Sequence, residues 1–246
     1  MELLEARGIC KSFGARPILR DVSLVLRKGE TVSLVGVSGA GKTTLFHVLS
    51  GLTRPERGQV LLSGQDITGT PGHISYMLQK DLLLPHKKVM DNVLLPLILR
   101  GVPRAQARAQ AEPLFETFSL EGTQDLYPSQ LSGGMRQRAA LMRTYLNSSG
   151  VVMLDEPFSA LDMITRGQMQ SWYGKVRERL GLSTLLITHD IDEAILMSDR
   201  IYVLSGSPGE IRHELQVSQS RNQRLDFNLN PAFLIYKQQI LDWLRP

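Results

Sequence analysis

The stretch GVSGAGKTT, residues 36–44, follows a predicted buried strand at residues 30–35 and precedes a predicted helix at residues 42–52. It fits the pattern G-x-x-x-x-G-K-[ST], in which glycines let backbone N–H groups approach phosphate oxygens closely. In this pattern Lys42 reaches the β- and γ-phosphates and Thr43 ligates Mg²⁺, while the helix N-terminus adds a positive dipole. The stretch therefore predicts a nucleoside triphosphate site, and its strand and helix context argues against a glycine-rich turn without a ligand.

The composition indicates one large α/β domain, or one domain with a helical insert, because the 246 residues are 42% apolar. Lys and Arg are spread along the chain, and the net charge is only +4, so no nucleic-acid partner is indicated. The single cysteine, Cys10, excludes an internal disulfide and fits a reducing cytosolic setting. The longest apolar run, residues 93–99, is too short for a membrane span, so we expect a soluble chain.

Periodicity divides the chain into three parts. Strand patterns dominate the first eighty residues, at 6–13, 22–29, 31–37, 59–64 and 74–78. Helical periodicity follows for about sixty residues, with a break or bend predicted at Pro113 and an N-cap at Ser132 for a helix that ends near Tyr145. Strands and helices then alternate, with strands at 151–156, 183–189 and 200–206, helices at 163–180 and 191–197, and a final amphipathic helix after Asn230 and Pro231. Alternation of this kind predicts a parallel sheet covered on both faces.

Two further motifs carry candidate chemistry. In VVMLDEP, residues 151–157, a strand ends in adjacent carboxylates at the sheet edge where ligands bind, so Asp155 suits the Mg²⁺ shell and Glu156 suits a water. A capping Asp and a solvated Glu are the alternative, which the neighbouring phosphate loop disfavours. LSGGMRQR, residues 131–138, is either a plain helix N-cap or a second phosphate site built from free N–H groups, a hydroxyl and a helix dipole.

The motifs occur together in one order: GVSGAGKTT, Gln79, LSGGMRQR, VVMLDEP, SALD at residues 159–162, and His189 after a strand. This set resembles the nucleotide-binding subunits of ATP-binding cassette (ABC) transporters over residues 1 to about 210. The resemblance implies an α/β P-loop NTPase fold with a mostly parallel central sheet, an N-terminal antiparallel β subdomain and a helical insert subdomain. It implies a nucleotide-binding domain at residues 1–217, with the insert at about 80–147, and a C-terminal extension at 218–246.

The resemblance also implies ATP and Mg²⁺ as ligands and a dimer in which the LSGG segment of one subunit closes over the ATP held by the other. Glu156 would polarise the attacking water, His189 would contact the γ-phosphate and Lys42 would stabilise charge. Thr43, Gln79 and Asp155 would arrange the metal, Phe13 would stack on adenine, and Asp162 would communicate across the dimer. The full nucleotide-contacting set that it implies is Phe13, Gly36, Ser38, Gly39, Ala40, Gly41, Lys42, Thr43, Thr44, Gln79, Ser132, Gly133, Gly134 and Asp162.

Some of these residues have structural alternatives. Phe13 could belong to the core, although Ser12 and Gly14 beside it favour an exposed turn. Gln79 and His189 could be polar residues at strand ends. In KDLLLPHKK, residues 80–88, the leucines either enter the core or form part of a groove that receives the membrane subunit.

Finer features resemble importers. The segments LLLP, VMDNVLLPL and VLSGSPGEI and the C-terminal helix resemble the nitrate, sulfonate and taurine class, whereas RTYLNSSG and MQSW are nearer to the branch for pyrimidine precursors of thiamine. Two departures from the sulfonate type are His86 in place of a frequent Trp and Arg143-Thr144-Tyr145 in place of Arg-Ala-Leu.

The resemblance implies permease subunits and, indirectly, an extracytoplasmic solute-binding protein as partners. It implies a cytoplasmic location, peripheral on the inner face of the cell membrane. The alternatives are an exporter or lipid-extraction ATPase, or a soluble cassette that clamps nucleic acid.

Overall fold

The strand ahead of the glycine-rich stretch, β3 (Thr31–Gly36), lies inside the larger of two sheets, and all six of its residues are buried. The structure is a computed structural model that describes residues 2–147, 150–218 and 227–245. Within this part of the chain the larger sheet has the strand order β10-β9-β3-β8-β7-β6. Neighbouring strands run parallel from β9 to β6, and β10 pairs antiparallel with β9. The remaining strands of this sheet are β6 (Ser75–Met77), β7 (Val151–Asp155), β8 (Ser183–Ile187), β9 (Arg200–Ser205) and β10 (Glu210–Gln216).

The smaller sheet is antiparallel, with the order β2-β1-β4-β5 among the described residues. Its strands are β1 (Glu2–Phe13), β2 (Arg16–Arg27), β4 (Arg57–Leu62) and β5 (Gln65–Asp66). The strands predicted at 6–13 and 22–29 were too short, because β1 already begins at Glu2, where it pairs with Arg27, and β2 begins at Arg16, directly after the tight turn at which Phe13 pairs with Arg16. Cross-strand pairing extends both strands through segments that mix apolar and polar residues, such as Leu4 paired with Leu26 and Leu19 paired with Lys11.

Four helices lie beside the sheets: α1 (Lys42–Leu49), α6 (Met163–Leu180), α7 (Ile191–Met197) and α8 (Pro231–Leu244). The bounds of α6, α7 and α8 agree with the prediction. Helix α1 is shorter than predicted and ends at Leu49, because Gly51 adopts φ +77° and a Cβ there would lie 2.3 Å from the carbonyl oxygen of Thr70. None of the helices in the described residues combines the length and apolar character that a membrane crossing needs.

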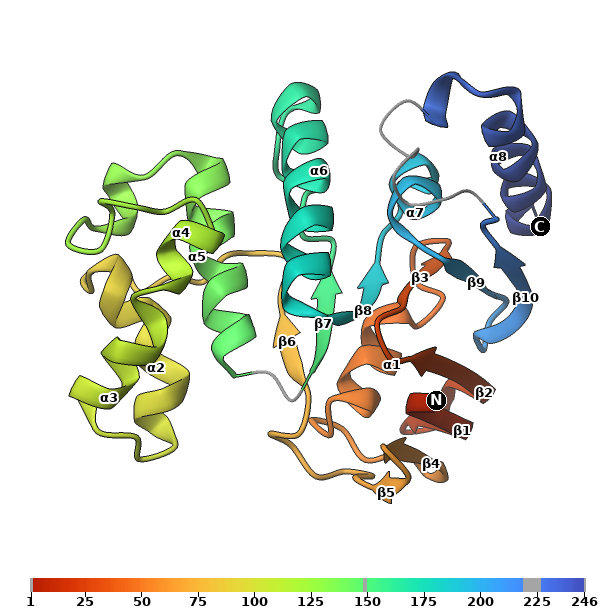
Figure 1. Ribbon diagram of the computed structural model, residues 1–246. Coiled ribbons are helices and arrows are strands. Elements are labelled where there is room, and N and C mark those ends of the chain that lie inside the picture. Colours follow the sequence, from red (N-terminus) through yellow and green to blue (C-terminus); the bar gives the residue numbers. More distant parts are fainter. Residues whose placement is uncertain (1, 148–149, 219–226, 246) are drawn as a thin grey trace.

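A helical segment lies to one side of the larger sheet, beyond α6 and β6 (Figure 1). It contains α2 (Val89–Leu99), α3 (Arg104–Ala111), α4 (Leu114–Thr117), the 3₁₀ turn η1 (Pro128–Gln130) and α5 (Gly133–Leu146). The break predicted at Pro113 is confirmed, because α3 ends at Ala111 and Pro113 caps α4. Helical periodicity was predicted after Gln79, and the first helix of this segment, α2, begins at Val89, with residues 80–88 ahead of it.

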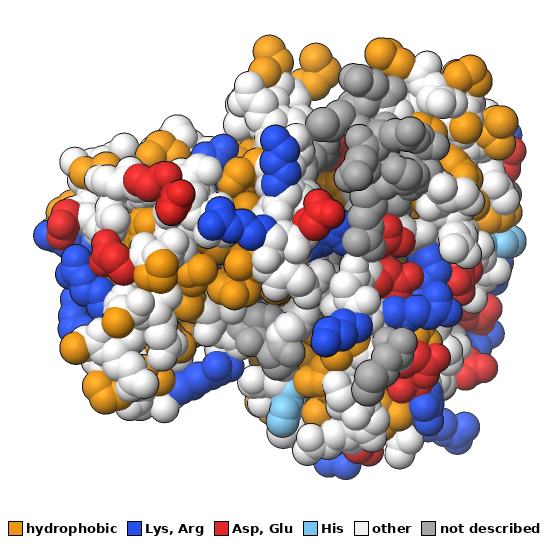
Figure 2. Space-filling view, in the orientation of Figure 1, with side chains coloured by type: hydrophobic (Ala, Val, Ile, Leu, Met, Phe, Trp, Pro, Cys, Tyr) orange, Lys and Arg blue, Asp and Glu red, His pale blue; other side chains and the backbone are white. Residues whose placement is uncertain are grey.

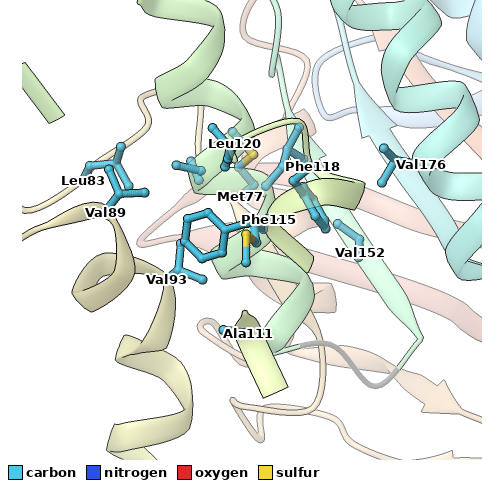
Figure 3. Packing of buried hydrophobic residues seen from close by; sticks show 14 of the residues in the cluster. Met77, Leu83, Val89, Val93, Ala111, Phe115, Phe118, Leu120, Val152 and Val176 are labelled. Carbon is cyan, nitrogen blue, oxygen red and sulfur yellow. The ribbon is translucent and has the colours of Figure 1, made fainter. Parts of the chain in front are cut away.

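In the described part of the chain, three apolar clusters hold the elements together. One lies between the sheets and packs α1 against both, and it includes Phe46 together with strand residues such as Leu34 and Leu24. A second joins the helical segment to the sheet and α6, where Phe115, Phe118 and Leu120 gather near Val152 and Val176 (Figure 3). The third places α8 over α7 and β9, with Phe233 and Ile240 buried and Tyr236 and Leu244 partly buried. The apolar face predicted for the final helix is therefore confirmed.

Two sequence-based predictions touch residues outside those described. Ser148 and Ser149 belong to the RTYLNSSG segment, and residues 219–226 open the predicted C-terminal extension. The described part of that extension contains the 3₁₀ turn η3 (Phe227–Leu229) and α8.

Phe115→Ala is expected to lower the free energy of unfolding by about 3–5 kcal/mol, because the change leaves a cavity where a ring only 1% exposed had packed. Urea denaturation followed by circular dichroism measures the effect. Leu99→Ala is the control, with a side chain 78% exposed and an expected change within about 0.5 kcal/mol. Equal changes in the two variants would contradict the packing described for the helical segment.

Candidate functional site: a phosphate loop beside paired carboxylates

The glycine-rich loop connects the end of β3 to the start of α1. Its central residues, Val37, Ser38 and Gly39, are exposed, whereas Ala40 is buried against the core. Gly41 caps the helix at φ +99°, and a Cβ there would lie 2.8 Å from Leu19 Cδ2. The loop thus presents backbone N–H groups and a helix N-terminus at the surface, which is the geometry that binds phosphate.

Lys42 lies over this loop. Its Nζ donates hydrogen bonds to the carbonyl oxygens of Gly36, at 2.7 Å, and Val37, at 3.1 Å. Burial lowers the pKa of Lys42, while the nearby carboxylates of Glu156 and Asp155 act in the opposite direction. The ammonium group is therefore within electrostatic reach of the phosphate loop and of both carboxylates.

Asp155 ends β7 and points toward the same region. Burial raises the pKa of this carboxyl and Glu156 raises it further, whereas a hydrogen bond from Tyr76 and the charges of His47 and Lys42 oppose the rise. Tyr76 Oη donates this bond to Oδ2 at 2.9 Å. Sequence reasoning missed Tyr76, because no motif contains it.

Glu156 follows with φ +46°, a left-handed conformation that is rare for a residue with a side chain. Its carboxylate lies between two predicted site residues. His189 Nδ1 is 2.9 Å from Oε1, and Gln79 Nε2 donates to Oε2 at 3.1 Å. The structure thus brings together Gln79, Glu156 and His189, which lie far apart in the sequence.

Ser159 is a further member of this group, which sequence reasoning named only as part of the SALD motif. Its hydroxyl accepts a hydrogen bond from Gln79 Nε2 at 3.3 Å and donates to the carbonyl oxygen of Glu156 at 2.9 Å. The signal in the sequence that could have identified Ser159 is its position, three residues after Glu156.

Phe13 lies at the turn between β1 and β2 with 56% of its surface exposed, so it is not part of the core. Lys11 Nζ is 5.3 Å from the ring centroid. Glu56 holds this turn, pairing with Lys11 at 2.7 Å and accepting a hydrogen bond from the backbone N of Ser12 at 2.6 Å. An exposed aromatic ring on a braced turn suits stacking on a base.

The LSGG segment lies apart from the phosphate loop. Ser132 caps α5 by accepting a hydrogen bond from the backbone N of Met135 at 3.2 Å, and Asp162 caps α6 in the same way from Thr165, at 3.0 Å. Figure 1 shows the start of α5 within the helical segment, separated from β3 and α1 by β7 and β8. One chain therefore does not bring Ser132, Gly133 and Gly134 to its own phosphate loop.

The residues predicted to hold Mg²⁺ fit that ion by their chemistry. Thr43 offers a hydroxyl at an exposed position in the first turn of α1, and Asp155 and Gln79 offer carboxylate and amide oxygens. Mg²⁺ prefers hard oxygen ligands and is commonly bound through one or two protein groups together with substrate phosphates. A partly buried carboxylate beside Lys42 and the phosphate loop matches this arrangement.

The fold and this edge of the sheet define a P-loop ATPase. The sequence matches the family model described as "ABC transporter" over residues 19–159. Formylaminopyrimidine import ATP-binding protein ThiZ of Halalkalibacterium halodurans is 39% identical over 210 residues, covering 85% of this chain and 82% of that protein. Taurine import ATP-binding protein TauB of Escherichia coli O157:H7 is 34% identical over 244 residues, covering 97% and 96%. The chain belongs to the ABC transporter family as an ATP-binding, ATP-hydrolysing subunit.

A solved structure is also similar over most of the fold. The dimeric structure of a bacterial ABC transporter cassette superposes with a TM-score of 0.74 at 28% identity, covering 89% of this chain and all of that chain. The expected α/β fold, with a mostly parallel sheet, an antiparallel sheet and helices, is confirmed.

Lys42→Ala is expected to weaken ATP binding by about 10- to 100-fold, because hydrogen bonds to charged groups contribute about 1.5–3 kcal/mol each. Isothermal titration calorimetry measures the affinity. Lys28→Ala, at an exposed lysine outside the loop, is the control and should bind ATP like the parent. Unchanged affinity in Lys42→Ala would contradict the placement of the triphosphate on this loop.

Proposed function

We propose that this chain powers the import of a small organic solute, as the ATPase subunit of a transporter that closes a dimer of cassettes around ATP. The observation that carries the proposal is the incomplete site: a phosphate loop and catalytic carboxylates meet at one edge, while the LSGG segment lies elsewhere on the chain. A second copy supplies the missing segment. The dimeric cassette structure and the import proteins among the relatives support this proposal.

The residues divide the reaction between them. The loop from Gly36 to Thr44 and the Lys42 ammonium bind the phosphates. Thr43, Asp155 and Gln79 would hold Mg²⁺, which would supply positive charge beside the phosphates. Glu156 accepts hydrogen bonding from the water that attacks the γ-phosphorus, as the bond to the β,γ-bridging oxygen breaks. His189 donates toward the γ-phosphate, and Phe13 stacks on the adenine. Ser132, Gly133 and Gly134 of the second copy bind the γ-phosphate from the opposite side, and Asp162 transmits closure between copies.

In the arrangement described, Gln79 and His189 occupy the two oxygens of Glu156. When these side chains turn toward the nucleotide, both oxygens of Glu156 become fully available to a water. Because Gln79 begins the loop that leads to the helical segment, its movement ties the catalytic carboxylate to that segment. We therefore propose that nucleotide binding releases Glu156 and moves the helical segment in one step.

The loop after Gln79 is also the proposed contact with the permease. Leu83 is buried in the core, Leu84 is half-buried, and Leu82 and Pro85 are exposed. One leucine of the run therefore enters the core, as one alternative expected, and the exposed residues remain available for a groove, as the other expected. Leu82 is 53% exposed and adopts φ +45°. Arg143 holds it there by donating to the carbonyl oxygens of Leu82, at 2.8 Å, and Asp81, at 2.5 Å. The strained, braced loop presents an apolar side chain at the rim of a small cavity of about 140 Å³ lined by Leu78, Pro96 and Arg143.

The proposed partners are membrane permease subunits and, through them, an extracytoplasmic solute-binding protein. This places the chain on the cytoplasmic face of the cell membrane. Figure 2 shows Lys and Arg side chains interspersed with Asp and Glu on the visible face, which favours protein partners over nucleic acid. The proposed solute is nitrate-, sulfonate- or taurine-like, or a pyrimidine precursor of thiamine. Support comes from the names of two relatives, which are import proteins for taurine and for formylaminopyrimidine. The proposed domain limits are 1–217, with a helical insert at about 80–147, and 218–246.

Glu156→Gln is expected to bind ATP but hydrolyse it at least about 100-fold more slowly, because the neutral amide is a poor acceptor for the proton of the attacking water. The stalled chain should elute as a dimer in size-exclusion chromatography with ATP and as a monomer without it. The parent, run in parallel, should not accumulate the ATP dimer. Hydrolysis by the variant at the parent rate would show that Glu156 does not serve the water.

Leu82→Asn is expected to reduce binding of the purified chain to stripped membranes of the source cell, measured by sedimentation, by about tenfold as apolar burial is lost. Asn tolerates the left-handed backbone, so the loop itself should persist. ATPase activity of the isolated chain should stay at the parent level. Leu99→Asn, at a residue 78% exposed on α2, is the control. Equal membrane binding by the parent and the Leu82 variant would remove this residue from the permease contact.

A further inference from the structure

Tyr76 contacts both the Asp155 carboxylate and helix α1, which follows the phosphate loop. It lies on β6, where it pairs with Met153 of β7 in parallel register. Paired residues in a sheet point to the same face, and Met153 and Asp155 share a face because side chains alternate along a strand. Tyr76 and Asp155 are therefore on one face of the sheet, toward α1.

The ring of Tyr76 is held by α1. Its centroid lies 5.7 Å from that of Phe46 with the planes at 75°, and 6.0 Å from that of His47 with the planes at 68°. Edge-to-face contacts of this kind fix the orientation of a ring. Since α1 begins at Lys42, the helix that follows the phosphate loop also sets the position of the Tyr76 hydroxyl.

The hydroxyl engages only one oxygen of Asp155. Tyr76 Oη donates to Oδ2 at 2.9 Å, and no described residue donates a hydrogen bond to the second oxygen, Oδ1, which is left for another partner. A bond from a fixed donor restrains rotation of the carboxyl group, because turning it would break a charge-assisted hydrogen bond in a half-buried site. The carboxylate is thus aimed by a residue that itself lies outside the site's motifs.

We propose that Tyr76 is a positioning residue that orients the Asp155 carboxylate toward the Mg²⁺ bound with ATP, using α1 as its support. The proposal rests on the function proposed above, in which Asp155 holds that metal. Tyr76 acts through Asp155 and touches neither the nucleotide nor the water. Its effect should therefore appear in the metal-dependent part of nucleotide binding.

The test is Tyr76→Phe, which removes the hydroxyl and keeps the ring between Phe46 and His47. Calorimetry measures the affinity of the full chain for the non-hydrolysable analogue AMP-PNP, with excess MgCl₂ and with EDTA. The ratio of the two affinities should fall about tenfold in the variant, as expected when one hydrogen bond to a charged group is lost. The affinity in EDTA should match that of the parent.

Tyr127→Phe, at a tyrosine 43% exposed on the helical segment, is the matched control and should keep the parent ratio. Thermal melting accompanies each variant to show that it is folded. A parent-like ratio in Tyr76→Phe would overturn the proposal, and so would an equal loss of affinity with and without Mg²⁺, which would assign Tyr76 to support of the loop alone. If Mg²⁺ did not change the affinity of the parent for AMP-PNP, the proposed role of Asp155 in holding the metal would be contradicted, and with it the role of Tyr76.

Discussion

The parallel register of three strands is the constraint on which the site depends. Leu34 of β3 pairs with Ile187 of β8, and Ile187 pairs with Asp155 of β7, so these residues form one row across the sheet. Because the strands run in the same direction, the chain leaves the sheet at the same edge after each of them. The phosphate loop, His189 and the carboxylates of Asp155 and Glu156 thus emerge side by side, although more than a hundred residues separate the first from the others. A shift of one residue in any strand would turn its side chains to the other face.

The packing around this row supports the predicted site residues. Helix α1 fills the space between the two sheets, so the lysine at its start and the tyrosine against its side are held by the same core. Arg200, only 4% exposed, joins the sheets by bonding Glu30 at 2.6 Å and the carbonyl oxygen of Val25 at 2.6 Å. This buried pair fixes the antiparallel sheet, and with it the turn that carries Phe13, relative to β3 and β9. The nucleotide site is therefore a product of both sheets.

The helical segment shows where prediction from sequence succeeded and where it could not. Pro113 broke the helix as its missing N–H requires, and Ser132 capped α5 as its side chain favours, because both effects are local. The sequence did not decide which of Leu82, Leu83 and Leu84 is buried, since a run of leucines carries no signal of which one faces the core. Tertiary contacts decided it: Leu83 joined the apolar cluster, and Arg143, sixty-one residues from Leu82, held that residue outward.

The sequence by itself determined which chemical groups this protein carries: a glycine loop with Lys42 and Thr43, predicted to bind phosphate and metal, two carboxylates after a buried strand, and a capped helix with free N–H groups. These depend on residue type and short spacing, which are readable along the chain. The tertiary structure alone decided which of these groups meet. It brought Gln79, Ser159 and His189 to Glu156 and Tyr76 to Asp155, and it kept Ser132 and Gly134 away from the phosphate loop. Contacts of this kind follow from strand order, register and helix packing, which join residues far apart in sequence and leave no local pattern.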